Sequence, residues 1–430
     1  MARRLRLSDD GFDTAYARLI SARGERLDAA EAAVRPIVAA VRERGVEAVL
    51  ELTAKFDGLV LTADALKVSD AQRQRARAAC PPNVIAALEL AAERIHAFHA
   101  RQAPEDARWV DDQGVTLGWR WTPVDAAGVY APGGLAAYPS SVLMNAIPAK
   151  AAGVARVVMA TPPGKLMENP AILAAADIAG VDEIWTVGGA QAIAALAYGA
   201  GKLAPCDVVV GPGNAYVAAA KKIVFGDVGV DAVAGPSEVF ILADSSAPAE
   251  WLAADLLAQA EHDADAQSVL LTDDAAHADA VCAAVEKQLA KGDAGASARE
   301  SWSRHGAVIL VDTLADACAL IDKAAPEHVQ IATVDPEPLA KRIRHAGALF
   351  LGVHAPEALG DYVAGPSHVL PTTRAARYAS GVNVLTFMKR TTIIGASAEG
   401  VAAIGAQAAD LADAEGLPAH ARSVRTRLGQ

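Results

Sequence analysis

The chain has 430 residues, which is too long for one ordinary hydrophobic core and predicts at least two domains. Hydrophobic residues make up 53% of the sequence, enough apolar surface to exclude an intrinsically disordered chain. The formal net charge of −12 argues against nucleic acid and against an anionic membrane surface as partners.

The N-terminal region, up to about residue 125, is expected to be mostly helical, because apolar residues recur at helical spacing. Helices are expected over residues 27–44, 46–55, 70–80 and 82–102. The basic N-terminus is not followed by an apolar core, so it is not predicted to be a signal peptide. No run of about 18 apolar residues occurs anywhere, so no membrane span is expected.

Cysteine usage indicates a reducing compartment. Cys80, Cys206, Cys282 and Cys318 are far apart in the sequence, and no Cys-x-x-Cys pattern occurs. We therefore predict a cytoplasmic protein in which these residues stay reduced and act as small buried hydrophobic side chains.

Beyond Pro123, short β-branched runs alternate with alanine-rich helical stretches. After a first strand ending near Tyr130, strands are expected over 157–160, 183–187, 207–210, 238–243, 268–272, 307–311, 329–332 and 348–351. Such alternation predicts βαβ units with parallel sheets, whose ligands gather at the carboxyl ends of the strands. The strands suffice for two α/β units joined at Ala234-Gly235-Pro236-Ser237. After Pro371 the strand signal fades into short helices, and the last residues form a tail too small for its own core.

Three glycine-rich turns follow predicted strands, and two of them lead directly into helices. They are Tyr130-Ala131-Pro132-Gly133-Gly134, Val187-Gly188-Gly189-Ala190-Gln191 and Gly211-Pro212-Gly213-Asn214-Ala215-Tyr216. Glycine permits close backbone approach and a helix N-terminus attracts anions, which favours a dinucleotide or phosphate ligand. Ordinary strand-to-helix turns have a similar composition, and Tyr216 replaces the third glycine of the Gly-x-Gly-x-x-Gly fingerprint. Spacing alone therefore does not support an orthodox Rossmann NAD site.

A possible metal site begins with Gln259 and His262, which share one face of a helix expected over residues 250–264. Asp361, in a glycine-punctuated loop, and His420, in the tail, would complete a four-ligand set. A mixed nitrogen and oxygen set suits zinc, and it would also suit manganese or cobalt. The alternative for His262 is an ordinary surface or core histidine.

Pro326-Glu327-His328 stands at the start of a predicted strand, and a Glu beside a His supplies two proton acceptors of different basicity. Neighbours on a strand point to opposite faces, so the pair can share one site only if the strand begins irregularly. Without such a start, the pair is an ordinary surface feature.

Taken together, these motifs resemble the histidinol dehydrogenase family. The resemblance runs from about Arg94 to His420, and its motifs stand in the same order along the chain. They are residues 138–145, 188–196, 211–221, 234–238, 259–263, 326–328 and 360–371. Ser367 is one departure, because the family usually has Asn there.

The resemblance implies oxidation of L-histidinol to L-histidine, the last step of histidine biosynthesis, through bound L-histidinal and two NAD-dependent hydride transfers. It also implies a zinc-dependent homodimer in which the partner's C-terminal tail completes each active site. Matched residue by residue, it implies zinc ligands Gln259, His262, Asp361 and His420, and proton acceptors Glu327 and His328. NAD would be held by Tyr130, Gln191 and Asn214, and the substrate by the zinc ligands with Ser237, His328 and Glu415.

We therefore expect an α/β protein with two Rossmann-like units, each with a parallel sheet, a helical N-terminal segment and a small helical tail. Residues 1–129 would pack with the 238–380 unit, 130–237 would bind NAD, 238–380 would bind metal and substrate, and 381–430 would form the dimer tail. Three alternatives remain open. They are a sister NAD-dependent dehydrogenase of another small primary alcohol, a zinc hydrolase in which Glu327 activates metal-bound water, and a non-catalytic metal- or nucleotide-binding module, against which the presence of Glu327 and His328 beside the four presumed ligands speaks.

Overall fold

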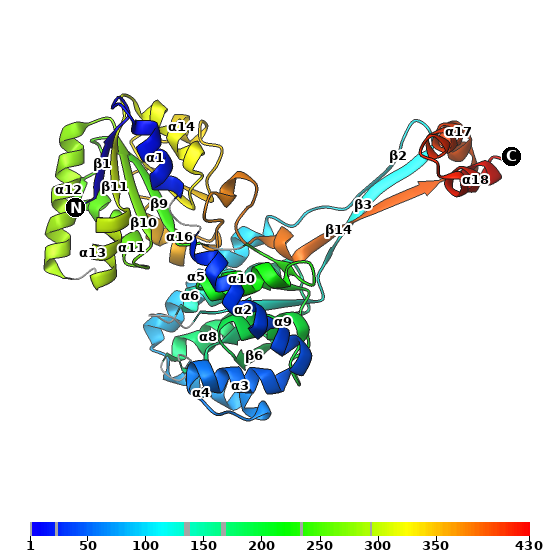
Figure 1. The fold of residues 1–430 in the computed structure, drawn as a ribbon, viewed down its shortest axis with the longest axis horizontal. Coiled ribbons are helices and arrows are strands. Elements are labelled where there is room, and N and C mark those ends of the chain that lie inside the picture. The colour runs from blue at the N-terminus through cyan, green and yellow to red at the C-terminus, as the bar shows by residue number, and fades with distance from the viewer. Residues whose placement is uncertain (1, 22–24, 133–137, 165–168, 233–234, 293–294) are drawn as a thin grey trace.

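The computed structural model describes residues 2–21, 25–132, 138–164, 169–232, 235–292 and 295–430 as two α/β units and a projecting arm (Figure 1). Gly133 and Gly134 of the first predicted turn, and Ala234 of the predicted joint, lie outside the described residues. Among the described helices, none has both the length and the apolar character needed to cross a membrane.

The first unit contains a five-stranded parallel sheet in the order β6-β5-β4-β7-β8. Its strands are β4 (Ala126–Tyr130), β5 (Arg156–Thr161), β6 (Glu183–Thr186), β7 (Val208–Val210) and β8 (Gly229–Val230). The connecting helices are α6 (Pro139–Ala151), α8 (Pro170–Ile178), α9 (Gly189–Tyr198) and α10 (Ala215–Val224). The chain runs outward from β4 to β6 and returns to β7 on the other side of β4, which creates a topological switch point.

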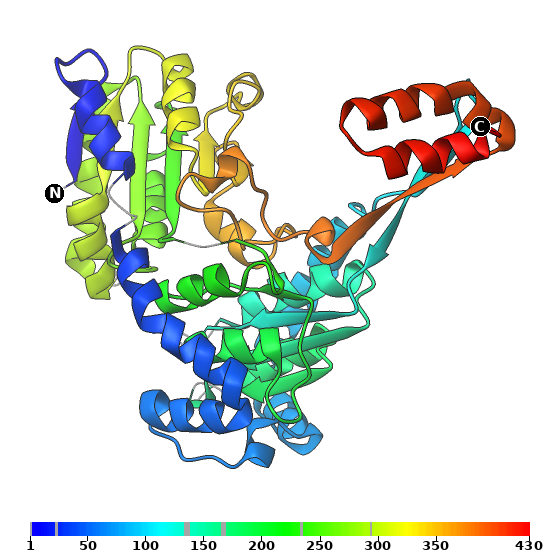
Figure 2. The same ribbon diagram turned by 45° about the vertical axis from the view of Figure 1, so that its right-hand side comes forward.

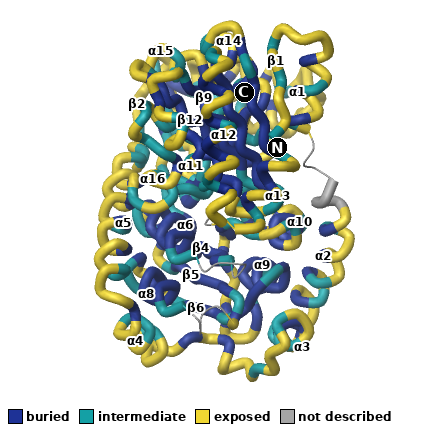
Figure 3. Tube along the Cα trace, turned by 90° about the vertical axis from the view of Figure 1, so that its left-hand side faces the viewer, coloured by how far each residue is buried: buried dark blue, intermediate teal, exposed yellow. Residues whose placement is uncertain are grey.

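The second unit repeats this strand order in a parallel sheet, β1-β11-β10-β9-β12-β13, to which the N-terminal strand adds an edge. Its strands are β1 (Arg3–Arg6), β9 (Glu238–Ala243), β10 (Gln267–Thr272), β11 (Ala307–Leu310), β12 (His328–Ala332) and β13 (Ala348–Leu351). One face carries α11 (Ala249–Ala260), α12 (Ala275–Lys291) and α13 (Gly295–His305), and the other carries α1 (Phe12–Ser21), α14 (Leu314–Ala324) and α15 (Glu337–Ala340). Strand β9 is buried along its whole length, because helices cover both faces of the sheet (Figure 3).

The expected strands between residues 157 and 351 are all present, and each begins and ends within one residue of the predicted position. The expected α/β class with two parallel sheets is therefore confirmed. Buried β-branched runs bounded by glycine, proline or aspartate carry enough local information to place a strand of a parallel sheet.

The N-terminal region differs from our expectation that residues 1–129 pack with the second unit. The elements β1 and α1 do so, through side chains such as Phe12 and Tyr16, and Arg94 of a later helix donates hydrogen bonds to the backbone oxygens of Val363 and Ala364. The next helices, α2 (Glu25–Arg44), α3 (Val46–Asp57), α4 (Asp70–Ala79) and α5 (Pro82–Ala100), cover the first sheet instead. The apolar stripe of α2, formed by Val34, Val38 and Val41, packs in the same hydrophobic core as α9 and α10. Burial of this stripe against the first unit explains why α2 packs there and not on the second unit.

The arm is an antiparallel ribbon of β2 (Ala107–Val110), β3 (Val115–Pro123) and β14 (Met388–Ala396), followed by α17 (Ala398–Ala414) and α18 (Pro418–Arg427). The sequence did not indicate these strands. Most residues of β14 are exposed or half-exposed, so no buried face imposes an alternating apolar pattern. Its partner β3 lies in a distant part of the chain. Figure 2 shows α17 and α18 packed together at the end of the ribbon, away from both sheets.

The cysteines lead to a first prediction. Cys80, Cys206 and Cys318 are buried, Cys282 is half-buried, and no disulfide is formed among them. Burial raises the pKa of the Cys206 thiol to about 12, which suppresses the reactive thiolate. We expect alkylation of the native protein to modify at most Cys282, as measured by peptide mass spectrometry. Rapid native modification of Cys206 would contradict this.

Candidate active site

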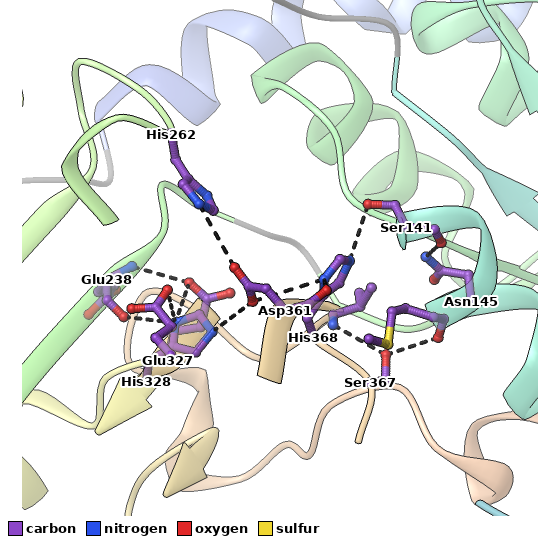
Figure 4. Close-up of polar contacts among 12 residues, drawn as sticks. Ser141, Asn145, Glu238, His262, Glu327, His328, Asp361, Ser367 and His368 are labelled. Atoms are coloured by element: carbon purple, nitrogen blue, oxygen red, sulfur yellow. Dashed lines mark hydrogen bonds and ion pairs between the residues drawn. The ribbon is translucent and has the colours of Figure 1, made fainter. Parts of the chain in front are cut away.

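The polar side chains of the second unit gather where the amino ends of β9 and β12 meet α16 (Glu357–Tyr362) (Figure 4). The two strands are parallel neighbours, with His328 opposite Val239. We expected ligands at the carboxyl ends of the strands, whereas in the second sheet these polar side chains lie at the amino ends. Here the segments leading into the strands, together with α16, supply the polar groups, so the candidate site lies at the opposite edge.

Glu327 and His328 converge because β12 begins irregularly. Ala325, which ends α14, adopts the left-handed conformation with φ 49°, and Pro326 follows it. Regular strand geometry starts only at His328, so Glu327 is not bound by the alternation of a strand. Its Oε2 lies 3.7 Å from His328 Nδ1. The two side chains therefore face one site, as the sequence required of a functional pair.

His328 is held as a neutral imidazole with one defined tautomer. Its Nδ1 lies 3.1 Å from the backbone oxygen of Glu238, and since a carbonyl only accepts, Nδ1 carries the proton. Burial lowers the pKa of His328 to about 3, against the opposing effect of that hydrogen bond. Nε2 is buried and has no hydrogen-bond partner among the described residues, and it lies 4.0 Å from Oδ1 of Asp361. Nε2 thus carries an unprotonated lone pair that has no partner within the described part of the chain.

The pKa of Glu327 is shifted in the direction opposite to that of His328. Burial and the neighbouring charge of Glu238 raise the pKa of its carboxyl well above the usual value. Its Oε2 accepts a hydrogen bond of 3.1 Å from the backbone N–H of Glu238, and the Ser237 side chain also hydrogen-bonds to the carboxyl. These contacts fix the carboxyl in place, and its raised pKa suits a group that both accepts and releases a proton.

Two of the four predicted metal ligands, His262 and Asp361, lie close to each other beside this pair. Gln259 lies in the last turn of α11 and is fully buried, yet neither its oxygen nor its nitrogen has a hydrogen-bond partner among the described residues. His262 follows the end of the helix in a turn, rather than lying on it as expected, and its Nε2 is 3.9 Å from Asp361 Oδ2. An orphaned buried amide is costly unless a ligand satisfies it, so these residues fit a metal ion.

Glu357 was missed by the sequence reading. It is 2% exposed on α16, its Oε1 lies 3.5 Å from His328 Nδ1, and burial raises its pKa well above the usual value. His328, Glu357 and Asp361 also form a possible metal-holding group, with ligand atoms within 4.8 Å of one another. We favour the Gln259 set, because Glu357 faces the protonated nitrogen of His328. Nothing in the sequence spacing indicates that Glu357 lies near His328, so only the tertiary structure reveals this contact.

A hydrogen bond joins the two units beside this site. Ser141, in the first turn of α6, donates its hydroxyl to His368 Nε2 at 3.2 Å, since His368 Nδ1 donates to the Asp361 backbone oxygen at 2.9 Å. Burial lowers the pKa of His368 to about 4, consistent with this neutral tautomer. Because α6 follows β4, the carboxyl edge of the first sheet faces Asp361 and His328 (Figure 4).

That carboxyl edge carries the residues expected to hold NAD. Tyr130 ends β4, and its hydroxyl accepts a hydrogen bond of 3.0 Å from Gly189 N–H at the start of α9. Gln191 is buried in the first turn of α9, and Asn214 caps α10 by accepting from the N–H groups of Tyr216 and Val217. All three lie beside the switch point between β4 and β7, where ligands of such sheets bind, so this edge fits a dinucleotide.

A cavity of about 370 Å³ adjoins the site and is lined by His328, Phe350, Leu359, Asp361 and His368 among others. Its walls are mainly apolar. The Phe350 ring packs directly against Gly360, where a Cβ atom would lie only 2.5 Å from the ring. Such a hollow beside a metal site and a buried base suits a small molecule with few polar groups.

Glu415 and His420 are not brought to this site within one chain. Both are exposed on the helical hairpin at the end of the arm, at the end of α17 and in α18. Figure 1 shows that hairpin well separated from α16. A single chain thus brings His262 and Asp361 together but leaves His420, the fourth predicted ligand, elsewhere.

Comparison with known proteins agrees with these features. A family model described as histidinol dehydrogenase matches residues 21–428. Histidinol dehydrogenases of Rhodospirillum rubrum and Caulobacter vibrioides are 55% and 54% identical to this chain, covering 100% and 99% of it and 99% of each relative. The crystal structure of histidinol dehydrogenase from Elizabethkingia anophelis matches with a TM-score of 0.92 and 34% identity, covering 100% of this chain and 98% of that chain. The chain therefore belongs to the histidinol dehydrogenase family, which uses NAD and zinc in the final step of histidine biosynthesis.

Proposed function

We propose that the edge formed by β9, β12 and α16 oxidises L-histidinol to L-histidine, with L-histidinal kept bound between two hydride transfers. The observation that carries this assignment is the convergence of Glu327, His328, Asp361 and His262. The buried amide of Gln259, which has no hydrogen-bond partner among the described residues, supports it. The NAD edge of the first unit faces the same place through the Ser141–His368 contact. Alcohol, metal and nicotinamide can therefore meet at one point.

Each cofactor has a defined task. Zinc, when bound, would anchor the imidazole and amino nitrogens of the substrate and so fix its carbinol carbon in place. NAD would supply hydride acceptance at the carboxyl edge of the first sheet, once in each oxidation. Gln259, His262 and Asp361 would hold the metal, with His420 of the partner subunit as the fourth ligand. Tyr130, Gln191 and Asn214 would hold NAD.

The chain's own acid–base groups divide the proton transfers. His328 Nε2 takes the hydroxyl proton as the first hydride leaves, because its Nδ1 already carries a proton and is held by the Glu238 backbone oxygen. Glu327 then takes a proton from the water that attacks the aldehyde, and the second hydride leaves. Ser237 and Glu415 would contact the substrate. The buried, preorganised site keeps the reactive aldehyde from bulk water.

We further propose a homodimer in which each tail enters the other subunit's site. The hairpin of α17 and α18 exposes Ile404, Leu411 and Leu417, which are 43%, 66% and 42% exposed. Beside Asp361, Leu359 and Tyr362 of α16 are 47% and 58% exposed. Apolar surface at both places suits mutual burial in a two-fold dimer. The biosynthetic role and the widely separated free cysteines support a cytoplasmic location.

Metal removal tests the assignment. Dialysis against a chelator should abolish NAD reduction with L-histidinol and weaken L-histidinol binding, and added zinc should restore both. NAD affinity should change little, because Tyr130, Gln191 and Asn214 lie on the other sheet from the presumed metal ligands. Absorbance of NADH, identification of the product and calorimetry for each ligand provide the measurements.

Three outcomes would count against the assignment. Full activity in metal-free protein would remove the metal from the mechanism. Hydrolytic turnover without NADH would favour the zinc hydrolase, in which Glu327 activates metal-bound water. Faster oxidation of another small primary alcohol, under matched conditions, would favour the sister dehydrogenase.

A further inference from the structure

A buried ion pair in the first unit has no part in the chemistry described above. Lys221, in the last turn of α10, and Asp231, directly after β8, pair with side chains that are only 2% and 4% exposed. Lysine is rarely buried this completely, and removing two charges from water offsets much of their attraction. The reason for keeping the pair should therefore lie in what else the two groups hold.

Both charges hold the backbone of Gly211. Lys221 Nζ donates to the Gly211 carbonyl oxygen at 2.7 Å, and the Gly211 N–H donates to Asp231 Oδ2 at 2.9 Å. Both polar groups of one peptide residue are thus held by opposite charges, in what we call the Gly211 clamp. Hydrogen bonds to charged groups are roughly twice as strong as neutral ones, so this residue is fixed firmly.

Gly211 occupies the tightest point of the switch region. It follows β7 directly, has φ +122°, and a Cβ placed on it would lie 2.2 Å from the backbone oxygen of Tyr130. The ends of β4 and β7 therefore touch at this residue, and the chain continues through Pro212 and Gly213 to Asn214. Small rotations at Gly211 would redirect the whole turn, because glycine itself imposes little conformational restraint.

We propose that Lys221 and Asp231 are positioning residues for NAD, holding the turn at 211–214 in the shape that presents Asn214 beside Tyr130. The proposal rests on the assignment of these two residues to NAD in the proposed function. Direct contact with a cofactor phosphate is not needed, since the Lys221 ammonium is enclosed and already engaged by Gly211 and Asp231. The clamp instead preorganises the turn before the cofactor arrives.

The test compares Lys221→Met, Asp231→Asn and the double variant with wild type in zinc-loaded protein. Either single variant leaves one buried charge unpaired and can destabilise the fold, whereas the double variant leaves none. For the double variant we expect a wild-type melting temperature, and a dissociation constant for NAD raised about 10- to 100-fold, the scale of one charge-assisted hydrogen bond. Calorimetry with NAD alone measures this without turnover.

Steady-state kinetics separate positioning from general damage. The KM for NAD should rise with the dissociation constant, while kcat at saturating NAD, the KM for L-histidinol and zinc content stay at wild-type values. Lys222→Met is the matched control, because Lys222 is the next residue, 46% exposed, and pairs with Glu31 at the surface. That variant should bind NAD normally.

Two results would overturn the clamp. One is wild-type NAD affinity in a folded double variant, and the other is a parallel loss of zinc, L-histidinol and NAD binding in that variant. Asn214→Ala tells this failure from failure of the proposed NAD turn. If Asn214→Ala weakens NAD binding while the double variant does not, the clamp alone is wrong. If neither variant weakens it, the turn is not the NAD site and both proposals fall.

Discussion

Glu327→Gln should slow the oxidation of L-histidinal far more than the oxidation of L-histidinol, because only the aldehyde step needs an activated water. The amide keeps the size of the side chain and can still accept from the Glu238 backbone N–H, but it cannot take a proton. Loss of a proton-transfer group typically costs about 10²- to 10⁴-fold in rate. Single-turnover experiments started from the alcohol and from the aldehyde measure the two steps separately.

His328→Ala should show the reverse selectivity and slow the first hydride transfer by a similar factor, about 10²- to 10⁴-fold, because Nε2 is the group that takes the hydroxyl proton. Glu337→Gln provides a control, since this exposed carboxyl lies beyond the opposite end of β12. Equal slowing of both steps by Glu327→Gln would show that the assigned division between the two bases is wrong. Unchanged zinc content and melting temperature must accompany either result.

Mixed dimers should recover activity that both parent proteins lack. One parent carries His420→Ala, which removes the fourth proposed zinc ligand, and the other carries Glu327→Gln with His328→Ala. If tails are exchanged, one site of the hybrid combines intact bases with an intact tail, and the other site lacks both. The hybrid should therefore approach half of the wild-type activity per dimer, against nearly none for either parent.

The experiment requires proof that each purified dimer contains one subunit of each parent. Different affinity tags on the two parents allow hybrids to be purified in sequence, and native mass spectrometry can verify one copy of each. Verified hybrids that remain inactive, while wild-type subunits tagged in the same way are active, would show that each tail serves its own subunit. The arm would then have to fold back, because α18, which contains His420, lies far from α16, which contains Asp361, in the single chain (Figure 1).

The sequence alone determined the strands of both parallel sheets and the family. A strand such as β9, buried on both faces, must be apolar along its whole length, and its flanking turns need particular residues, so the signal is local. The resemblance also pointed to Gln259, His262, Glu327, His328 and Asp361, and the fold brings the last four of these side chains together.

Only the tertiary structure decided how those elements are used. The site lies at the amino ends of β9 and β12 because α16 and the left-handed Ala325 bring side chains there, and no local pattern encodes that meeting. The β3–β14 ribbon and the Lys221–Asp231 clamp likewise join segments that the chain path, rather than spacing, makes neighbours. The tertiary structure also buries Glu327 and His328. Burial raises the pKa of Glu327 and lowers the pKa of His328, and neither shift follows from the residue type alone.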